Sequence, residues 1–364
     1  MTELYILDRN FNILGVIDEY VSIIWRPSFS EVGDFEIYLG ATEKAVDLLK
    51  ENRYIVRSSD ITVDAGGNTT YKKVMLIKNQ HIVTDVENGD FLTVTGKQLK
   101  FLLHQRIVWK QTTLNGTVEK AIRRLVDENA ITTDTNRVIP NLILGDLLGL
   151  SETIEKQITG DALDEIITEI CTTYNYGWDI YIYNNQLVFI VYQGTDRSYT
   201  QTERPYVVFS EDFENLYNTE YEKNTESYGN TALVGGQGEG LARTYAIVND
   251  NNAGLERFEI FVDAKSVSNK VKDEDTGEEK ELTATAYKNL LLEEGNEKLA
   301  EAAYTEGFTG ELLSDVAFIY EKDFYLGDLV TVINKYGLTK DVRVMSAIES
   351  EDDSGNKLVP QFNI

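Results

Sequence analysis

The run Tyr325-Leu-Gly-Asp-Leu-Val-Thr-Val-Ile333 is followed by Asp341-Val-Arg-Val-Met-Ser-Ala-Ile348 and by Leu358-Val-Pro-Gln-Phe362. Each run is short and rich in the apolar and β-branched residues that favour β-strands. The gaps between the runs contain Tyr336-Gly337 and Asp352-Asp-Ser-Gly355, and Gly, Asn and Asp accept the dihedrals of tight turns. The pattern therefore predicts three consecutive antiparallel strands, and the rest of the chain is organised around them.

A similar series occurs near the N-terminal end, in Tyr54-Ile-Val56, Val74-Met-Leu-Ile77 and Gly89-Asp-Phe-Leu-Thr-Val94. The matched positions are Val56 with Val330, Val74-Met75 with Val344-Met345, and Gly89 with Gly355. We therefore predict two similar small antiparallel β-barrels, one at each end of the chain. The alternative is that two unrelated meanders share strands, turns and glycines, in which case residues 54–96 and 325–362 will differ in strand order.

The composition excludes several classes of protein. The 364 residues include 61 acidic and 34 basic residues, which gives a net charge of -27. A protein that neutralises DNA phosphates over a broad surface needs many Lys and Arg residues, so this class is excluded. The acidity indicates either solubility alone or a surface that faces DNA without binding it. The single cysteine, Cys171, excludes an intramolecular disulfide framework.

The sequence also carries no targeting signal that we recognise. The first ten residues lack the basic head and apolar run of a signal peptide. No stretch approaches the roughly 18 apolar residues that a membrane span requires. We expect a soluble protein that is made in the cytoplasm and does not insert into a membrane.

The first two domains follow from a change in periodicity near residue 100. Residues 1–100 read as strands and turns, and we assign them to the first β-barrel domain. Residues 101–204 add helical periodicity and form an α+β domain. The predicted elements are a hairpin over 4–17, strands over 21–26 and 29–39, helices over 42–49, 115–129 and from the N-cap Asp161 to Gly177, and a hairpin over 178–192.

The remaining chain reads as a β domain with a helical insertion. Strand patterns over 205–265 and 311–364, including Val316–Tyr320, are assigned to the second β-barrel domain. Residues 266–310 form the insertion, because the strand pattern stops and a helix follows. Its apolar stripe contains Tyr287, Leu291, Gly295, Leu299 and Ala302. The predicted fold class is thus mixed β and α+β, with two similar barrels, an intervening α+β domain and a helix-containing insertion in the second barrel.

No catalytic, cofactor or metal motif rises above background. Gly235-Gly-Gln-Gly-Glu-Gly240 lacks the last glycine of a dinucleotide fingerprint and is interpreted as a turn or bulge. Asp273 and Asp275 hint at a calcium loop, but Gly277 falls at the wrong position. The remaining candidates, each interpreted as structural or solvated, are His81, His104, Ser210, Cys171 and the acidic pairs Asp212/Glu214, Glu293/Glu294 and Asp352/Asp353. We expect no enzymatic activity, no cofactor and no metal.

The order of several short motifs resembles a tail-protein family of siphophages that infect Gram-positive hosts. The motifs are Gly194-Thr-Asp-Arg-Ser198, Val207-Val-Phe-Ser210, Arg257-Phe-Glu-Ile-Phe-Val-Asp-Ala264 and Tyr325-x-Gly-Asp-x-Val330, together with Asn230, Val234, Arg243, Tyr221 and Glu36. The resemblance spans nearly the whole chain. Its signature residues are Trp25, Gly33, Phe35, Asp196, Arg197, Phe209, Asn215, Gly236, Gly238, Arg257, Asp263, Gly327 and Asp328.

The resemblance implies a baseplate-hub protein at the tip of a virion tail. Such hubs are homotrimers with two similar barrels per chain, so three chains present six barrels to a sixfold tail tube. The implied partners are the distal tail protein ring, the tape-measure protein, and a receptor-binding, spike or lysin subunit, with DNA passing through the channel without specific binding. The chain ends at Ile364, soon after the second barrel, so we expect no lysin extension.

Two other classes stay open at this point. A carbohydrate-binding β module would use exposed aromatic residues, and the 21 tyrosines and three tryptophans are compatible with it. A peptidoglycan-acting glycosidase would need an acid pair that the sequence does not reveal. A further expectation concerns Gly327, which we predict to have a positive φ angle.

Overall fold

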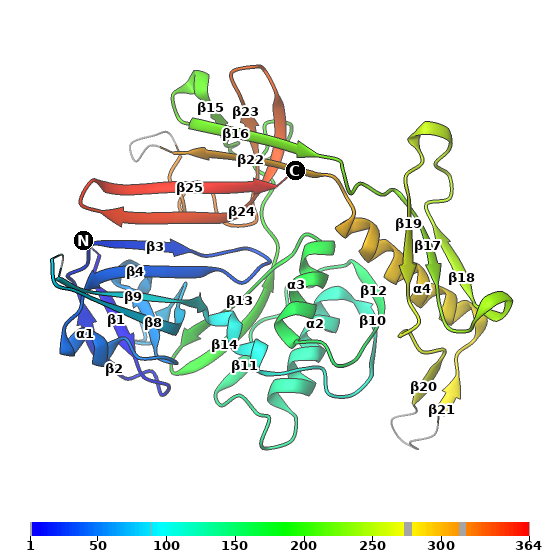
Figure 1. Ribbon diagram of the computed structural model, residues 1–364, viewed down its shortest axis with the longest axis horizontal. Coiled ribbons are helices and arrows are strands. Elements are labelled where there is room, and N and C mark those ends of the chain that lie inside the picture. The colour runs from blue at the N-terminus through cyan, green and yellow to red at the C-terminus, as the bar shows by residue number, and fades with distance from the viewer. Residues whose placement is uncertain (1, 88, 273–278, 313–317, 364) are drawn as a thin grey trace.

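The computed structural model describes residues 2–87, 89–272, 279–312 and 318–363 (Figure 1). Its helices are α1 (Glu43–Leu48), α2 (Val118–Val126), α3 (Leu163–Thr173) and α4 (Ala284–Glu301). The strands of the largest sheet are β1 (Leu4–Leu7), β2 (Ile13–Ile17), β3 (Ser22–Arg26), β4 (Asp34–Gly40), β5 (Tyr54–Arg57), β8 (Met75–Asp85), β9 (Gly89–Gln98), β15 (Val208–Ser210), β16 (Tyr217–Asn224), β22 (Thr305–Glu311), β23 (Leu329–Ile333), β24 (Thr339–Asp352) and β25 (Gly355–Asn363).

These strands form one continuous sheet that joins the two ends of the chain. Its order is β16-β22-β25-β24-β3-β4-β9-β8-β5-β1-β2, with β23 beside β24 and β15 beside β23. Figure 1 shows β25 and β24 lying directly next to β3 and β4. The β-rich mixed fold class is confirmed. Two closed barrels are not, because the pairing among the described strands follows an open path.

The sheet contains the same five-strand arrangement twice. We call β3, β4, β5, β8 and β9 the first repeat, and β16, β22, β23, β24 and β25 the second repeat. In both, the first two strands pair with each other, the second pairs with the fifth, the fifth with the fourth, and the fourth with the third, always antiparallel. The predicted similarity of the two end pieces is therefore confirmed in strand order.

A β-bulge lies at the same place in both repeats. Lys78 is skipped in the pairing of β8 with β9, and Met345 is skipped in the pairing of β24 with β25. Each lies seven positions before the aspartate that begins the turn of its hairpin. The residue pairs at the two turns are Asp85 with Gly89 and Asp352 with Gly355, so the predicted match of the two glycines is confirmed.

An aromatic pair also recurs at the same place. Trp25 on the first strand of one repeat faces Phe35, and Tyr221 on the first strand of the other faces Phe308. Their ring centroids are 5.3 Å and 6.5 Å apart. Each phenylalanine in turn pairs with the fifth strand next to the bulge. A shared order, bulge and aromatic pair are more than two unrelated meanders would have in common.

Two of the predicted residue matches are displaced along the strands. Val330 corresponds to Ile55, not to Val56, and Met75 corresponds to Val342. All four residues of β5 are buried, so the strand lacks the alternation of apolar and polar residues that would have fixed its register. The sequence therefore located the repeat but not its register.

The α+β domain packs beneath the first repeat. Its five-stranded sheet has the order β11 (Leu142–Leu144), β14 (Gln186–Tyr192), β13 (Gly177–Tyr183), β7 (Thr69–Tyr71) and β6 (Ile61–Val63). A second pair, β10 (Thr112–Thr117) and β12 (Thr153–Ile158), lies beside α2 and α3. Asn184 and Asn185 both have positive φ, which suits the two-residue turn of the predicted hairpin.

Several predicted boundaries in these domains were wrong. The predicted helix over 115–129 starts later, at Val118, because the preceding residues pair as β10. Helix α3 has Ala162 at its N-cap, not Asp161, and Gly177 does not end it but opens β13. The predicted strand over 29–39 begins at Asp34, which leaves the preceding residues in a connecting loop.

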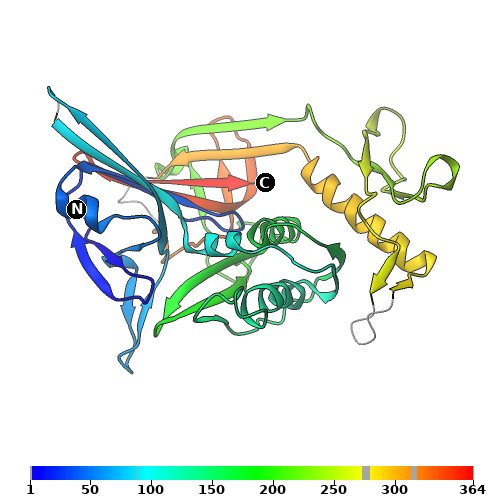
Figure 2. The ribbon, with the colours of Figure 1, turned by 60° about the horizontal axis from the view of Figure 1, so that its bottom comes forward.

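A separate core contains the strands β17 (Thr231–Gly235), β18 (Tyr245–Val248) and β19 (Glu259–Asp263). These strands pack against α4, as Figure 2 shows at the right of the molecule. A Cβ on Gly295 would lie 2.6 Å from Val234 and Val248, so glycine lets the helix approach the strands closely. The two short strands β20 (Lys270–Lys272) and β21 (Glu279–Glu281) precede the helix. We call residues 225–304 the inserted unit.

The inserted unit is larger than the insertion expected from the sequence. That expectation placed 205–265 in the second barrel and 266–310 in the insertion, whereas the strands over 231–263 share their core with α4. The predicted apolar stripe of α4 is buried at four of its positions, Tyr287, Leu291, Gly295 and Leu299. The predicted strand over 316–320 and the aspartates near 273–277 lie wholly or partly outside the described residues.

Candidate functional site

The two repeats meet where the end of β24 pairs with β3. Strand β23 covers β24 only from Thr339 to Arg343, so the free edge beyond it is available to another strand. There Glu349 faces Trp25, and the pairing continues antiparallel to Asp352 and Ser22. We call this pairing the internal junction. It is the place where the N-terminal and C-terminal parts of the chain become one sheet.

A cluster of charged side chains lies against the internal junction. Arg57 Nη2 lies 2.9 Å from Glu349 Oε1, and Lys73 Nζ lies 3.1 Å from the same oxygen. Arg57 Nε also contacts Asp60 Oδ2 at 2.6 Å, and Lys73 Nζ contacts Glu321 Oε2 at 2.9 Å. Arg57, Asp60 and Lys73 are buried. Since β5 supplies Arg57 and β24 supplies Glu349, these contacts tie one repeat to the other.

The charges of this cluster shift each other's pKa values. Burial raises the pKa of Glu349, but Arg57 and Lys73 outweigh burial and hold that pKa below its ordinary value. Burial lowers the pKa of Arg57, yet Glu349 and Asp60 raise it by more, so its guanidinium stays charged. Every charge therefore has a partner of opposite sign, which is typical of a structural joint and unlike a poised general acid or base.

A cleft of about 380 Å³ opens beside the internal junction. Trp25, Arg57, Glu349, Phe318 and Tyr320 are among the residues that line it. Lys73 Nζ lies 4.8 Å from the centre of the Tyr320 ring. Arg57 and Glu349 at its wall already bind each other.

We expect Glu349→Gln to lower the free energy of unfolding by about 1–2 kcal/mol at neutral pH. The side chain of Glu349 is 26% exposed, and Arg57 and Lys73 each keep a second carboxylate, so the loss is moderate. Folding lowers the pKa of Glu349. Its contribution is therefore complete above the unfolded pKa of about 4.3 and disappears as the pH falls through the folded value. Urea denaturation at a series of pH values measures this.

A matched control is Asp353→Asn, which removes the same charge at the exposed turn between β24 and β25. We expect it to change the free energy of unfolding by less than about 0.5 kcal/mol. If Glu349→Gln showed the same dependence of stability on pH as the unmodified protein, the assigned role of Glu349 would be wrong.

The signature residues lie in separate places. Trp25 and Phe35 face each other across β3 and β4 in the first repeat, and their rings are tilted by 43°. Gly33 lies in the loop between them, just before β4, and its N–H donates to Gln98 Oε1 at 3.2 Å. A Cβ on Gly33 would lie 2.0 Å from the carbonyl oxygen of Arg26. Their arrangement therefore fixes the turn that leads from β3 into β4.

A second group joins the α+β domain to the second repeat. Asp328 is buried, and its carboxylate accepts a hydrogen bond from Thr195 N at 2.7 Å and from Arg197 Nε at 2.8 Å. Asp196 bridges to the start of β23. Gly327 has φ +86°, which confirms the predicted positive φ. Residues 327–329, which lead into β23, are therefore held against the segment 194–198.

Phe209 and Asn215 stabilise the entry to the second repeat. Phe209 is fully buried, and its ring lies 5.2 Å from that of Phe324 and 5.9 Å from that of Phe362. Asn215 is buried, and its amide bonds to Ser210 N and to Val208 O at 2.7 Å and 2.9 Å. The amide thus closes the turn between β15 and β16.

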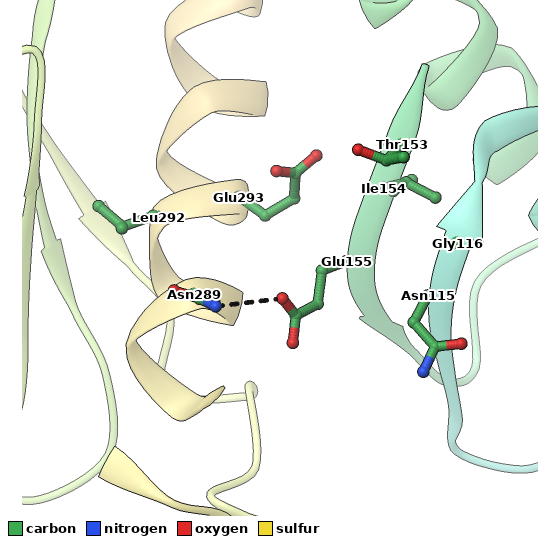
Figure 3. Close-up of a pocket in the computed structure, with 8 residues that line it drawn as sticks. All are labelled: Asn115, Gly116, Thr153, Ile154, Glu155, Asn289, Leu292 and Glu293. Atoms are coloured by element: carbon green, nitrogen blue, oxygen red, sulfur yellow. Dashed lines mark hydrogen bonds between the residues drawn. The ribbon is translucent and has the colours of Figure 1, made fainter. Parts of the chain in front are cut away.

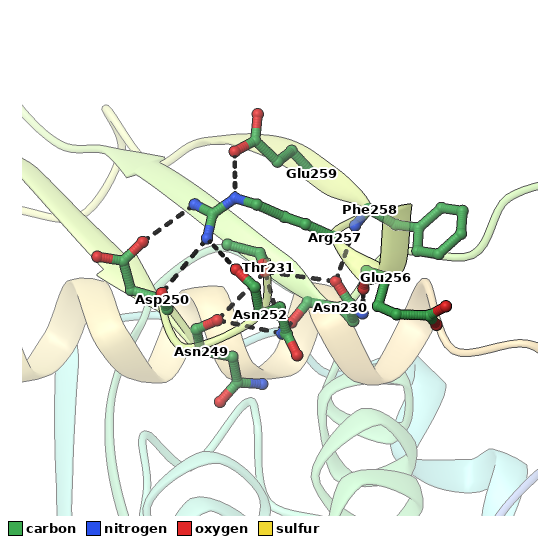
Figure 4. Close-up of polar contacts among 9 residues, drawn as sticks. All are labelled: Asn230, Thr231, Asn249, Asp250, Asn252, Glu256, Arg257, Phe258 and Glu259. Carbon is green, nitrogen blue, oxygen red and sulfur yellow. Dashed lines mark hydrogen bonds and ion pairs between the residues drawn. The ribbon is translucent and has the colours of Figure 1, made fainter. Parts of the chain in front are cut away.

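The last signature residues belong to the inserted unit. Gly236 lies against Tyr287, Gly238 has φ +101°, and Asp263 forms an ion pair with Arg243. Figure 4 shows Arg257 held by three neighbours. Its contacts are Nη2 to Asp250 Oδ1 at 3.0 Å, Nε to Glu259 Oε1 at 2.6 Å, and Nη1 to Asn252 O at 2.9 Å. The signature residues therefore fix turns and joints, and they do not converge on one chemical site.

A joint that the sequence did not reveal lies where both repeats and the α+β domain meet. The Phe29 ring is fully buried there, 5.3 Å from the Tyr192 ring and 6.0 Å from the Arg343 guanidinium. A Cβ on Gly177 would lie 2.4 Å from this ring, and a Cβ on Gly327 would lie 2.2 Å from it. We call these five residues the Phe29 joint. The two glycines were the available signal, since Gly177 is the first residue of β13 and Gly327 lies in the turn just before β23.

A second cleft, of about 440 Å³, lies between the inserted unit and the α+β domain (Figure 3). Asn289 on α4 donates to Glu155 on β12 at 3.3 Å across it. Nearby, Lys156 pairs with Glu297, which is buried, and with Glu169 at 3.2 Å. Polar contacts therefore hold the inserted unit in place.

Several of the motifs that we interpreted as structural can be located in the structure. The Gly-rich segment 235–240 forms turns, in which Gly238 and Gly240 have positive φ. Cys171 is fully buried, and burial raises the pKa of its thiol. His104 Nδ1 lies 2.9 Å from Asp164. Within the described part of the chain, no group of three His, Cys, Asp or Glu could hold a metal ion, and no helix is long and apolar enough to cross a membrane.

Comparison with solved structures shows the same fold in phage-related proteins. A tail protein from Neisseria meningitidis MC58 aligns with a TM-score of 0.57 at 13% identity, covering 100% of this chain and 96% of that one. The 43 kDa tail protein of prophage MuSo2 from Shewanella oneidensis gives 0.55 at 13%, covering 99% and 97%. Prophage tail protein gp18 from Listeria monocytogenes EGD-e gives 0.51 at 11%, covering 99% and 94%.

The comparison with curated proteins finds no significant match. One family, however, is matched from end to end, over residues 3–362, and it is described as Siphovirus ReqiPepy6 Gp37-like protein. This range includes both repeats, the α+β domain and the inserted unit. The chain therefore belongs to the Siphovirus ReqiPepy6 Gp37-like family.

Proposed function

We propose that the chain is a structural hub protein at the tip of a phage or phage-like tail. In this role it forms a homotrimeric ring that adapts a sixfold tail to threefold tip components and surrounds the tail channel. The observation that carries the proposal is the repeated five-strand arrangement with its shared bulge. Membership of a siphovirus family and the fold shared with tail proteins support the same role.

The repeat explains how one protein can face two symmetries. Three chains with two similar repeats each present six similar surfaces, while the ring as a whole keeps threefold symmetry. One face can then bind a sixfold neighbour, and the other a threefold one. We propose the distal tail protein ring and the tape-measure protein as neighbours on the tail side. A receptor-binding, spike or lysin subunit is proposed on the other side.

The net charge of -27 suits a channel through which DNA passes. DNA carries one negative charge per roughly 1.7 Å of its axis, so acidic side chains on the channel wall would repel it. At physiological ionic strength this repulsion reaches about 8 Å. It would therefore prevent adhesion of DNA without blocking its passage. No membrane insertion and no enzymatic step are part of this role.

Light scattering after size-exclusion chromatography tests the oligomeric state. We expect three times the mass of one chain, and electron microscopy of the particle should show a ring with six similar lobes and acidic residues along its inner wall. A monomer that binds saccharides or degrades purified peptidoglycan would contradict the proposal. A ring whose inner wall is neutral or basic would contradict the role given to the charge.

A further inference from the structure

Several strand edges of the main sheet have no neighbour among the described strands over part or all of their length. Two of them, on β16 and β8, are related to the internal junction. Strand β16 lies at one end of the sheet, where Figure 1 shows it at the top, and it pairs with β22 alone among the described strands. Strand β8 pairs with β5 only at Met75 and Leu76. From Ile82 to Thr84 its pairing among the described residues is with β9 alone. In Figure 2 this end of the teal hairpin stands clear of the body.

The internal junction shows what covers such edges. There the fourth strand of the second repeat, β24, pairs with the first strand of the first repeat, β3. The two free edges belong to the equivalent strands of the other repeat in each case. Strand β8, the fourth strand of the first repeat, is the counterpart of β24. Strand β16, the first strand of the second repeat, is the counterpart of β3. The chain therefore contains both halves of a second junction, but these two strands do not pair with each other within one chain.

The shared landmarks give the register of that second junction. The bulges at Lys78 and Met345 align β8 with β24, so Ile82 corresponds to Glu349 and Val83 to Ser350. The aromatic pairs align β16 with β3. The resulting counterparts are Tyr221 for Trp25 and Glu220 for Ile24.

We infer that β8 of one chain pairs antiparallel with β16 of a second copy of this chain, with Ile82 facing Tyr221 and Val83 facing Glu220. The inference rests on the proposed trimer and names the edges that close it. Three such contacts alternate with the three internal junctions, so that six similar junctions form a closed ring. Contacts of this head-to-tail kind give rings when their rotation closes.

The chemistry of the two edges fits this pairing. Ile82 is 48% exposed and Val83 is 46% exposed, although both are β-branched and apolar. An apolar strand edge that is left open invites unspecific pairing, so proteins normally cover it. Tyr221 on the opposite edge would pack across from Ile82, and an aromatic residue facing a β-branched one is a favourable cross-strand pair. The second copy thus covers surface that a single chain leaves exposed.

Disulfide cross-linking tests the register directly. Residues that face each other in antiparallel strands have Cα atoms about 4.5–5.5 Å apart, which suits a disulfide. We expect Val83→Cys combined with Glu220→Cys to give a covalent trimer under mild oxidation, visible in non-reducing electrophoresis. Each single variant should give no covalent trimer. Cys171 can remain, because it is fully buried.

The matched control shifts one cysteine by two positions along β16. Val83→Cys combined with Glu222→Cys keeps both residues exposed, but places the thiols diagonally, about 7–8 Å apart between Cα atoms. We expect much weaker cross-linking from this pair. Equal cross-linking of both pairs would overturn the inferred register.

A charge exchange provides an independent readout. Val83→Asp would place two carboxylates opposite each other, and we expect it to weaken each contact between chains about two- to fivefold. Adding Glu220→Lys should restore the trimer, as measured by light scattering over a range of concentrations. A trimer that neither cross-links nor responds to these charges would overturn the inferred edges while the proposed function stands. A monomer at all concentrations would overturn both.

Discussion

Replacing Lys100 by alanine is expected to lower the free energy of unfolding by about 3–5 kcal/mol. Lys100 is fully buried. Its ammonium group donates to three backbone carbonyls, Ser28 O at 2.9 Å, Phe29 O at 3.2 Å and Trp178 O at 3.0 Å. Alanine would leave all three acceptors without this donor and would also open a cavity. Thermal and chemical unfolding of the purified variant measure the loss.

We expect the loss of these hydrogen bonds to destabilise more than one loop, because the three carbonyls belong to two different domains. Ser28 and Phe29 belong to the loop before β4, and Trp178 belongs to β13, so Lys100 holds the first repeat to the α+β domain. Lys100→Met keeps most of the volume and separates the lost hydrogen bonds from the lost packing. Lys97→Ala is the control, because its side chain is 44% exposed and its contact with Asp34 is long, at 3.7 Å. A loss for Lys100→Ala no larger than that for Lys97→Ala would contradict this role.

Gly327→Val is expected to be nearly as damaging, at about 3–5 kcal/mol. The backbone there has φ +86°, which a β-branched residue adopts only with strain. In addition, the new Cβ would lie 2.2 Å from the Phe29 ring, which is locked in the Phe29 joint. We expect a lower melting temperature and faster proteolysis at the boundary between the α+β domain and the second repeat.

The variant Gly337→Val separates the effect of backbone strain from the effect of the contact with the Phe29 ring. Gly337 has φ +79°, but no heavy atom lies within 4 Å of its Cβ position. Valine there would cost only the backbone strain, about 1–3 kcal/mol. An equal loss at both glycines would show that the contact with Phe29 contributes nothing.

Local patterns in the sequence were sufficient to find the repeat, because each copy keeps a turn glycine and short apolar runs. The register was not accessible, because β5 is buried on both faces and its residues do not alternate. The closed barrels were predicted from the two similar series of strands, but whether a sheet closes depends on strand pairing between residues as distant as Trp25 and Glu349. Such contacts leave no local trace in a single sequence.

The contacts that join the domains could not be predicted from the sequence for the same reason. Lys100 reads as an ordinary surface lysine between Leu99 and Phe101, since its three acceptors come from distant backbone. The sequence of β17–β19 looks like a continuation of the second repeat. Its strand pattern indicates that one face of each strand is buried, but it does not indicate which element covers that face. Their partner is α4, which begins some twenty residues after β19 ends. The sequence names Asp328 as a signature residue, but its hydrogen bond with Arg197 is visible only in three dimensions.

The internal junction also bears on how a ring would assemble. Each chain makes this joint with its own backbone as it folds, at the high effective concentration that a covalent connection provides. Six separate chains would need five encounters to close a ring, and each encounter costs translational and rotational freedom. Three chains that already contain a joined pair need only two. Duplication inside one polypeptide would thus have removed more than half of the diffusive steps from the path to the finished collar.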